Sequence, residues 1–257
     1  MILHPNVKIN LGLNVLRRRE DCFHDIETVF LPYSGFSDTL DVEASDRPEI
    51  VVDGPCYTGW NPREDLCFKA WQMLAQERGI PAVRIHLTKT SPVGAGLGGG
   101  SSDAAFCLRA LDRLFSLGLD ERALLAYASR LGSDCSFFVL NRPCFAQGRG
   151  ELLSPSPVSL EDYEIKVEIP SGEAVSTREA YGGIIPRDRW TCPGVSLRDA
   201  LARPVEEWKE VLCNDFEKTV FPLHPGIARL KQELYDRGAV YAAMSGSGSA
   251  VFGLFRK

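Results

Sequence analysis

The 257-residue sequence lacks the features that mark several large classes of protein. No stretch approaches 18 uninterrupted apolar residues, so an ordinary membrane-spanning helix is not expected. The net charge of -5 at pH 7 argues against general binding to nucleic acid or to an acidic membrane. The N-terminus has neither the basic-then-apolar layout of a signal peptide nor the Arg- and Ser-rich composition of a transit peptide. We therefore expect a cytoplasmic protein of bacterial type.

Patterns of metal ligands and of disulfides are missing as well. The eight cysteines form no C-x-x-C pair, and neither they nor the four histidines show ligand spacing. Scattered cysteines in a cytosolic protein are normally reduced. The sequence therefore predicts no metal held by protein ligands alone. It also predicts reduced core thiols at positions 22, 56, 67, 107, 135, 144, 192 and 213.

The most informative segment that is present is a glycine-rich run between a predicted strand at 83–88 and a predicted helix. Clustered glycines let successive N–H groups converge, and a helix N-terminus attracts anions. We expect Ser101 or Ser102 to cap the helix. The sequence thus predicts a phosphate-binding loop that comprises Pro92, Val93, Gly94, Ala95, Gly96, Leu97, Gly98, Gly99, Gly100, Ser101 and Ser102.

Two familiar phosphate loops do not fit this segment. A P-loop needs a lysine beside its last glycine, and none is present. Gly94, Gly96 and Gly99 match the dinucleotide fingerprint, but Asp120 opens a helix where that motif needs an acid at the end of a second strand. A flexible linker is disfavoured because Leu97 stands between a strand and an apolar helix.

The remaining chain alternates between predicted strands and helices. The strand at 7–15 places Lys8, Asn10, Gly12 and Asn14 on one polar face, which in a lone strand would face solvent. Residues 154–157, with two prolines, form the best candidate linker. Further strands are expected at 24–31, 38–43, 137–140, 144–146, 163–169, 240–244 and 250–255, and helices at 66–78, 120–131 and 225–238.

In these motifs the chain resembles the GHMP kinases, which include galactokinase and the homoserine, mevalonate and phosphomevalonate kinases. The glycine loop resembles their ATP loop, and further matching segments follow in the right order at 8–11, 23–24, 132–138, 214–217 and 246–248. The resemblance is greatest to the branch that acts on a cytidyl-diphospho-methylerythritol. It implies an α+β fold with a domain like the second domain of ribosomal protein S5 at 1–154. A ferredoxin-like domain is implied at 155–257, ending sooner than in relatives.

The resemblance also implies a reaction and its catalytic residues. The γ-phosphoryl group of ATP would pass to the 2-hydroxyl of that small-molecule substrate, in the non-mevalonate route to isoprenoid precursors. Asp134 would be the base, and Lys8 would keep it ionised and stabilise the developing alkoxide. Mg²⁺ would be held mostly by the ATP phosphates, with Ser101 or Ser102 as the nearest protein oxygens.

Recognition of the two substrates is likewise implied by matching positions. Lys89 and Asp65 match positions near the adenosine, and His24 matches a residue that hydrogen-bonds cytosine. Phe23 stands where the family often has Tyr, and Asp65 stands where it has Asn. The other substrate-binding candidates are Asn10, Phe23, Phe30, Thr177, Tyr181, Ser245, Gly246 and Ser247.

Three other functions remain as alternatives. Another GHMP activity, of the homoserine or mevalonate type, would leave His24 and the candidate aromatic residues without a purpose. A non-catalytic module that binds a nucleotide or RNA is disfavoured by the acidic net charge and by the presence of both Lys8 and Asp134. A Rossmann oxidoreductase lacks its second strand and partner acid.

Overall fold

The structure is a computed structural model that describes residues 1–186 and 195–257. Cys192, expected to be a reduced thiol, lies outside the described residues. The chain forms two compact units, which are interleaved along the sequence. The first comprises residues 1–8, 32–93 and 98–142, and the second comprises residues 9–31, 94–97 and 143–257. Because these units are discontinuous, the predicted domains at 1–154 and 155–257 stay a prediction.

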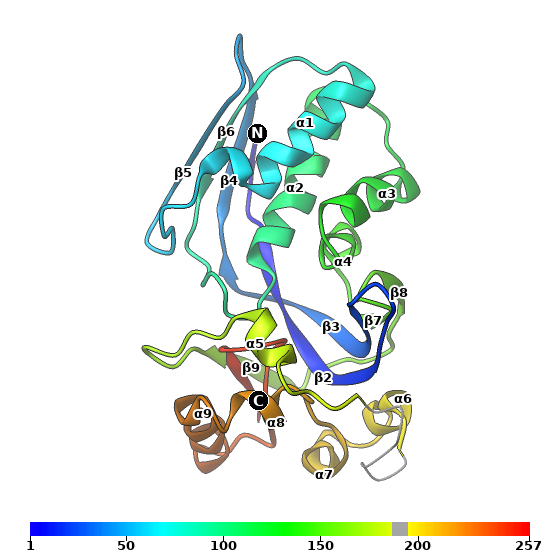
Figure 1. The fold of residues 1–257 in the computed structure, drawn as a ribbon, viewed down its shortest axis with the longest axis vertical. Helices are drawn as coiled ribbons and strands as arrows, with labels where there is room; N and C mark the ends of the chain where they lie inside the picture. Colours follow the sequence, from blue (N-terminus) through cyan, green and yellow to red (C-terminus); the bar gives the residue numbers. More distant parts are fainter. Residues whose placement is uncertain (187–194) are drawn as a thin grey trace. The chain divides into compact units, whose positions relative to one another are not determined.

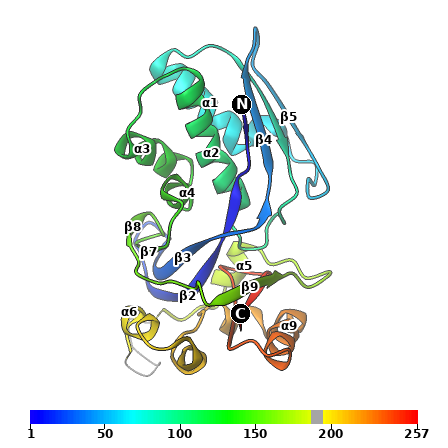
Figure 2. The same cartoon turned by 180° about the vertical axis from the view of Figure 1, so that it is seen from behind.

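The first unit is a four-stranded sheet with helices on one face (Figures 1 and 2). The sheet order is β1-β4-β6-β5, with β5 parallel to β6 and the other neighbours antiparallel. Its strands are β1 (Ile2–Leu3), β4 (Thr39–Ala44), β5 (Glu49–Asp53) and β6 (Val83–Thr88). Its helices are η1 (Pro62–Glu64), α1 (Leu66–Arg78), α2 (Gly99–Leu114), α3 (Glu121–Leu131) and α4 (Cys135–Leu140).

Local sequence signals account for the elements of this unit. Val83, Ile85 and Leu87 of β6 are buried, as their alternation predicts. Helix α1 ends at Gly79, which adopts the left-handed conformation. Helix α3 begins after Asp120, whose side chain accepts a hydrogen bond from the Ala123 amide. The predicted strand at 83–88 and the predicted helices at 66–78 and 120–131 are thus confirmed.

The second unit contains two antiparallel sheets. One has the order β2-β3-β7-β8, and its first two strands begin or end in the first unit. The other has the order β10-β11-β9, and α9 lies against β10 and β11. The strands are β2 (Asn6–Arg18), β3 (His24–Ser37), β7 (Cys144–Gln147), β8 (Leu152–Pro155), β9 (Tyr163–Glu168), β10 (Tyr241–Met244) and β11 (Val251–Arg256). The helices are α5 (Thr177–Tyr181), α6 (Leu197–Leu201), η2 (Val205–Glu207), α7 (Trp208–Val211), α8 (Glu217–Val220) and α9 (Pro225–Asp236).

Three local expectations were wrong. Residues 137–140 belong to helix α4 instead of a strand, because a short buried apolar run has no periodicity that separates the two states. Ser154 and Pro155 of the expected linker belong to β8, an edge strand, where proline is tolerated. The polar face of β2 is buried instead of solvated, since Lys8, Asn10 and Asn14 are at most 4% exposed.

Candidate active site

Helix α2 begins inside the glycine loop, earlier than the sequence predicted. Its first residue is Gly99, and Gly98 occupies the N-cap position in the left-handed conformation with φ 73°. Ser101 and Ser102 therefore lie in the first turn and do not cap the helix. Within the residues that the structure describes, no side chain caps α2. Its first amide groups can therefore bind an external anion.

The preceding part of the loop is fixed against a second glycine turn, at 245–249, in the second unit. Gly96 has φ 76°, and a β-carbon there would lie 2.2 Å from the carbonyl oxygen of Ser245. The Ser245 hydroxyl donates to the Gly96 carbonyl at 3.2 Å. The amide of Ala250 donates to the Ala95 carbonyl at 3.1 Å. Close contact between two backbones is what requires glycine at position 96.

Asn214, which the sequence analysis did not select as a site residue, holds that second turn in place. Its amide group donates to the carbonyls of Met244 and Gly246, both at 2.8 Å. Its side-chain oxygen accepts from the Phe216 amide at 3.0 Å. The sequence signal was present, since Asn214 begins one of the segments shared with the GHMP kinases, but its role depends on the fold.

Asn10 joins strand β2 to the same turn. Its side-chain oxygen lies 3.5 Å from the Ser245 hydroxyl, and its amide nitrogen donates to Thr28 at 3.1 Å. Ser245 and Gly246 are buried, and Ser247 is half-buried. The structure thus brings together the candidate residues Asn10, Ser245, Gly246 and Gly96.

Lys8 and Asp134 lie together in the first unit. Lys8 Nζ is 3.6 Å from Asp134 Oδ2, and the side chains are 4% and 28% exposed. Asp134 stands at the N-cap position of α4. Burial lowers the pKa of Lys8, and the charge of Asp134 opposes that shift. The pair can therefore present a partly exposed carboxylate beside a desolvated lysine.

This pair lies against the start of α2. A β-carbon at Gly98 would lie 3.3 Å from Lys8 Cε and 3.1 Å from the Phe138 ring. Glycine at position 98 therefore allows the aliphatic part of Lys8 to approach the phosphate-binding loop. A carboxylate, a cation and open helix amides are the groups that phosphoryl transfer requires near the reacting atoms.

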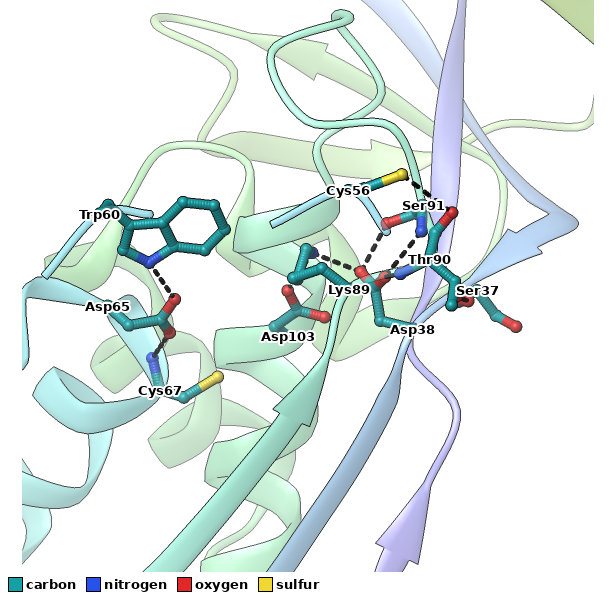
Figure 3. A network of polar contacts seen from close by, with 10 residues as sticks. All are labelled: Ser37, Asp38, Cys56, Trp60, Asp65, Cys67, Lys89, Thr90, Ser91 and Asp103. Carbon is teal, nitrogen blue, oxygen red and sulfur yellow. Dashed lines mark hydrogen bonds and ion pairs between the residues drawn. The ribbon is translucent and has the colours of Figure 1, made fainter. Parts of the chain in front are cut away.

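The two candidates for adenosine binding occupy different surroundings (Figure 3). Asp65 is half-buried, and its carboxylate accepts from the Cys67 amide at 2.8 Å and from Trp60 Nε1 at 3.2 Å. Lys89 is buried, and its ammonium group pairs with Asp38 and Asp103. Asp38 and Asp103 were not predicted as site residues, because nothing in their local sequence indicates that they share one lysine.

The aromatic candidates fall into three environments in the second unit. His24 and Tyr181 stack, with ring centroids 4.6 Å apart and an interplanar angle of 17°. Phe23 is 55% exposed, with the Arg149 guanidinium 5.1 Å from its ring centroid. Phe30 is buried in β3. Thr177 is exposed at the start of α5, the helix that carries Tyr181.

A protein-built metal centre is not found among residues 1–186 and 195–257, where no group of three or more His, Cys, Asp or Glu side chains is arranged to hold an ion. Within the same ranges, no helix is long and apolar enough to cross a membrane. Ser101 is half-buried in the first turn of α2, whereas the Ser102 hydroxyl is buried and has no partner among the described residues. Of these two serines, Ser101 is therefore the better candidate to reach a phosphate-bound cation.

Comparisons with known proteins give consistent results along the chain. The family model "GHMP kinases N terminal domain" matches residues 65–142, and "GHMP kinases C terminal" matches residues 197–257. A Bacteroides thetaiotaomicron protein named 4-diphosphocytidyl-2-C-methyl-D-erythritol kinase is 49% identical over 99% of this chain and 92% of its own length. A Porphyromonas gingivalis protein of the same name is 43% identical over 100% and 93%.

Solved structures agree with these matches. The crystal structure of a 4-(cytidine 5'-diphospho)-2C-methyl-D-erythritol kinase has a TM-score of 0.81 at 35% identity, covering 99% of this chain and 90% of that one. A mevalonate kinase structure has a TM-score of 0.68 at 10% identity over 100% and 91%, which shows a shared fold alone. These findings confirm the predicted α+β fold of the GHMP kinases. The chain belongs to the GHMP kinase family.

Proposed function

We propose that this chain is an ATP-dependent kinase for the 2-hydroxyl group of 4-diphosphocytidyl-2-C-methyl-D-erythritol, in the methylerythritol phosphate route to isoprenoid precursors. The observation that carries the proposal is the Lys8–Asp134 pair, 3.6 Å apart, against the glycine start of an uncapped helix. The substrate follows from the names of relatives that match nearly the whole chain at 43–49% identity.

In this proposal the protein contributes position and charge. The amides at the start of α2 bind phosphate oxygens of ATP, since the helix dipole and the free N–H groups favour anions there. Asp134 accepts the proton of the attacking hydroxyl or supports its loss electrostatically. Lys8 places its positive charge beside Asp134 and stabilises the alkoxide that develops.

Mg²⁺ fits these surroundings as a phosphate-bound ion. It would neutralise charge on the β- and γ-phosphates, and ATP oxygens and water would supply most of its ligands. Of Ser101 and Ser102, we assign Ser101 to add a ligand, because Ser101 is half-buried in the first turn of α2 whereas Ser102 is buried.

Recognition of the cytidyl group is assigned to His24 and Tyr181. Burial lowers the pKa of His24, and nearby Arg18 adds to the shift, so the imidazole is neutral at pH 7. A neutral imidazole offers one hydrogen-bond donor and one acceptor. This suits the base-pairing edge of cytosine, which also carries both donor and acceptor groups. Tyr181 already stacks on the histidine ring and can provide an aromatic face for the base.

The other candidates receive supporting roles. Asn10, Ser245, Gly246 and Ser247 would face the methylerythritol and phosphate portions, together with Thr177. Asp65 would lie near the adenosine. The side chain of Lys89 is committed to Asp38 and Asp103, so we assign it support of the loop instead of contact with the nucleoside.

An ADP-release assay with three acceptors tests the proposal. We expect turnover with 4-diphosphocytidyl-2-C-methyl-D-erythritol, and none above background with mevalonate or homoserine, which have no cytosine for His24 and Tyr181 to bind. Equal turnover of mevalonate would contradict the substrate assignment, and absence of ADP release with all three would contradict the kinase assignment.

A further inference from the structure

A buried cluster of charged residues joins three segments of the first unit (Figure 3). Lys89 Nζ donates to Asp38 Oδ2 and, at 2.6 Å, to Asp103 Oδ2. The three side chains are at most 2% exposed. Asp38 precedes β4, Lys89 follows β6, and Asp103 belongs to α2. Removing three ionisable groups from water is costly, so their retention requires a compensating role or tight bonding.

Both side-chain oxygens of Asp38 accept hydrogen bonds. The amides of Thr90 and Ser91 donate to its Oδ1 at 2.7 and 2.8 Å. The Ser91 hydroxyl and Lys89 donate to its Oδ2. Asp38 thus ties the segment after β6 to the start of β4.

Asp103 differs from Asp38 in its bonding. Burial raises the pKa of Asp103 well above its ordinary value; the charge of Lys89 opposes the shift and that of Asp38 adds to it. Its Oδ1 is buried and has no hydrogen-bond partner among the described residues. The neighbouring carboxylates raise the pKa of Lys89 despite its burial. The cluster therefore holds one buried ammonium group between two buried carboxyl groups, of which only Asp103 has an oxygen without a hydrogen-bond partner among the described residues.

The cluster lies directly against the first residue of α2. A β-carbon at Gly99 would lie 3.0 Å from the Ser91 hydroxyl, 3.5 Å from Lys89 Nζ and 3.8 Å from Asp38 Oδ2. Gly99 and Asp103 are four residues apart, so they lie on the same face of the helix in successive turns. The helix is thus held by close packing at its first residue and by a hydrogen bond one turn later.

We propose that Asp38, Lys89, Ser91 and Asp103 are positioning residues for the phosphates of the nucleotide. They fix the position and orientation of the first turn of α2 relative to the segments before β4 and after β6. The open amide groups of that turn therefore keep pointing toward the phosphate oxygens of ATP. A displacement of about 1 Å is enough to impair such alignment. The inference rests on the proposed kinase function, because it assumes that ATP binds at this helix start.

The experiment compares the binding of Mg²⁺-ATP, without second substrate, in the full chain and in matched variants by calorimetry. Lys89→Met removes the buried cation, and Lys69→Met is its control, since Lys69 is exposed on α1 of the same unit. We expect Lys89→Met to raise the Kd for ATP about tenfold or more, the size associated with losing a hydrogen bond to a charged group. Lys69→Met should leave Kd unchanged.

Milder variants keep the test decisive if Lys89→Met does not fold. Ser91→Ala removes the hydroxyl that donates to Asp38 beside Gly99, and Asp103→Ala removes the hydrogen-bond partner of Lys89 one turn later. Each substitution should raise the Kd for ATP severalfold. Asp103→Asn keeps the size of the group and an oxygen that can accept from Lys89, so it should recover most of the affinity that Asp103→Ala loses. If Ser91→Ala and Asp103→Ala bind ATP as the parent does while melting at lower temperature, the cluster only stabilises the fold and the proposal is wrong.

A second readout separates this inference from the proposed function. In the ADP-release assay, the KM for ATP should rise in these variants while the KM for the cytidyl substrate stays within about twofold, because the substrate candidates lie on other segments. Equal increases in both KM values would contradict a role specific to the nucleotide. If the parent protein binds ATP but does not phosphorylate the cytidyl substrate, the proposed function fails and the calorimetric comparison still decides the positioning role.

Discussion

Lys8 and Asp134 differ sharply in their exposure to water, and that difference suits their proposed roles. The lysine side chain is 4% exposed and the aspartate side chain is 28% exposed. A desolvated ammonium group interacts strongly with nearby negative charge, whereas the carboxylate remains accessible to an incoming hydroxyl group. Burial lowers the pKa of Lys8, and the charge and hydrogen bond of Asp134 oppose that shift.

Asp134→Asn should reduce kcat by about 100-fold or more, because the amide has nearly the same shape but cannot accept the proton or carry the charge. The melting temperature and the Kd for ATP should change little, since the α2 amides are untouched. Asp46→Asn, at an exposed position of the same unit, is the control and should keep full activity. Near-normal kcat in Asp134→Asn would reject the catalytic role.

His224 should make the stability of the second unit depend on pH. Its Nδ1 lies 2.8 Å from Glu173 and its Nε2 lies 3.1 Å from Glu179, and the ring is 15% exposed. The hydrogen bonds to Glu173 and then Glu179 raise the pKa of His224. Because the folded-state pKa is the higher one, the stabilisation is complete below the unfolded value of about 6.5 and is lost as the pH rises through the folded value.

His224→Gln removes this titration and keeps some hydrogen bonding. The difference in the free energy of unfolding between parent and variant should be greatest near pH 6 and should shrink toward pH 9. Urea denaturation at several pH values measures it. A difference that stays constant over this range would show that the histidine acts by packing alone.

At the scale of elements, the glycine loop combines positions that need glycine for different reasons. Gly96 combines φ 76° with an approach of 2.2 Å between its missing β-carbon and the Ser245 carbonyl oxygen. Gly100 lies inside the first turn of α2, and a β-carbon there would meet no atom within 4 Å. The fold therefore requires glycine at position 96, whereas glycine at position 100 leaves open space beside the first turn of α2.

Gly96→Ala should lower the free energy of unfolding by more than about 2 kcal/mol, because it adds left-handed strain and a backbone clash. Gly100→Ala should change it by less than about 1 kcal/mol, since alanine favours a helix. Chemical denaturation of both variants provides the comparison. Equal stability of the two would show that the contact between residues 96 and 245 does not constrain the loop.

The sequence predicted some elements well and others poorly, for physical reasons. Strand β6 and helix α1 were predicted because alternation and a terminal Gly79 act locally. The start of α2 was placed three or four residues late, because Ser101 or Ser102 was expected as the cap and a left-handed Gly98 took that position. Helix α4 was taken for a strand because its six residues are too few to show a helical period.

At the scale of the whole molecule, the cysteines differ in their exposure to solvent, which their spacing in the sequence did not reveal. Cys67, Cys107 and Cys135 are buried, as expected of core thiols, but Cys22 is exposed. Burial also raises the pKa of Cys135 to about 12. A thiol reacts as its thiolate. Burial should therefore protect these positions by keeping the reagent away and, at Cys135, also by raising the pKa of the thiol.

Alkylation of the native protein with iodoacetamide at pH 8 should therefore modify Cys22 well before Cys67, Cys107 or Cys135. These three thiols, and the buried Cys144, should react only once urea unfolds the chain. Peptide mass spectrometry at successive times measures the order. Early labelling of Cys135 in the folded protein would contradict its burial at the start of α4.

The sequence by itself determined the glycine loop, most strands, the longer helices α1, α2, α3 and α9, and the family, because these depend on local periodicity, backbone freedom and motifs in a fixed order. It also supplied Lys8 and Asp134 as candidates, through resemblance. Only the tertiary structure decided that Lys8 and Asp134 lie 3.6 Å apart and that Lys89 is buried between Asp38 and Asp103. Such pairings join residues tens of positions apart, and the burial that gives them their electrostatic strength exists only after the chain has folded.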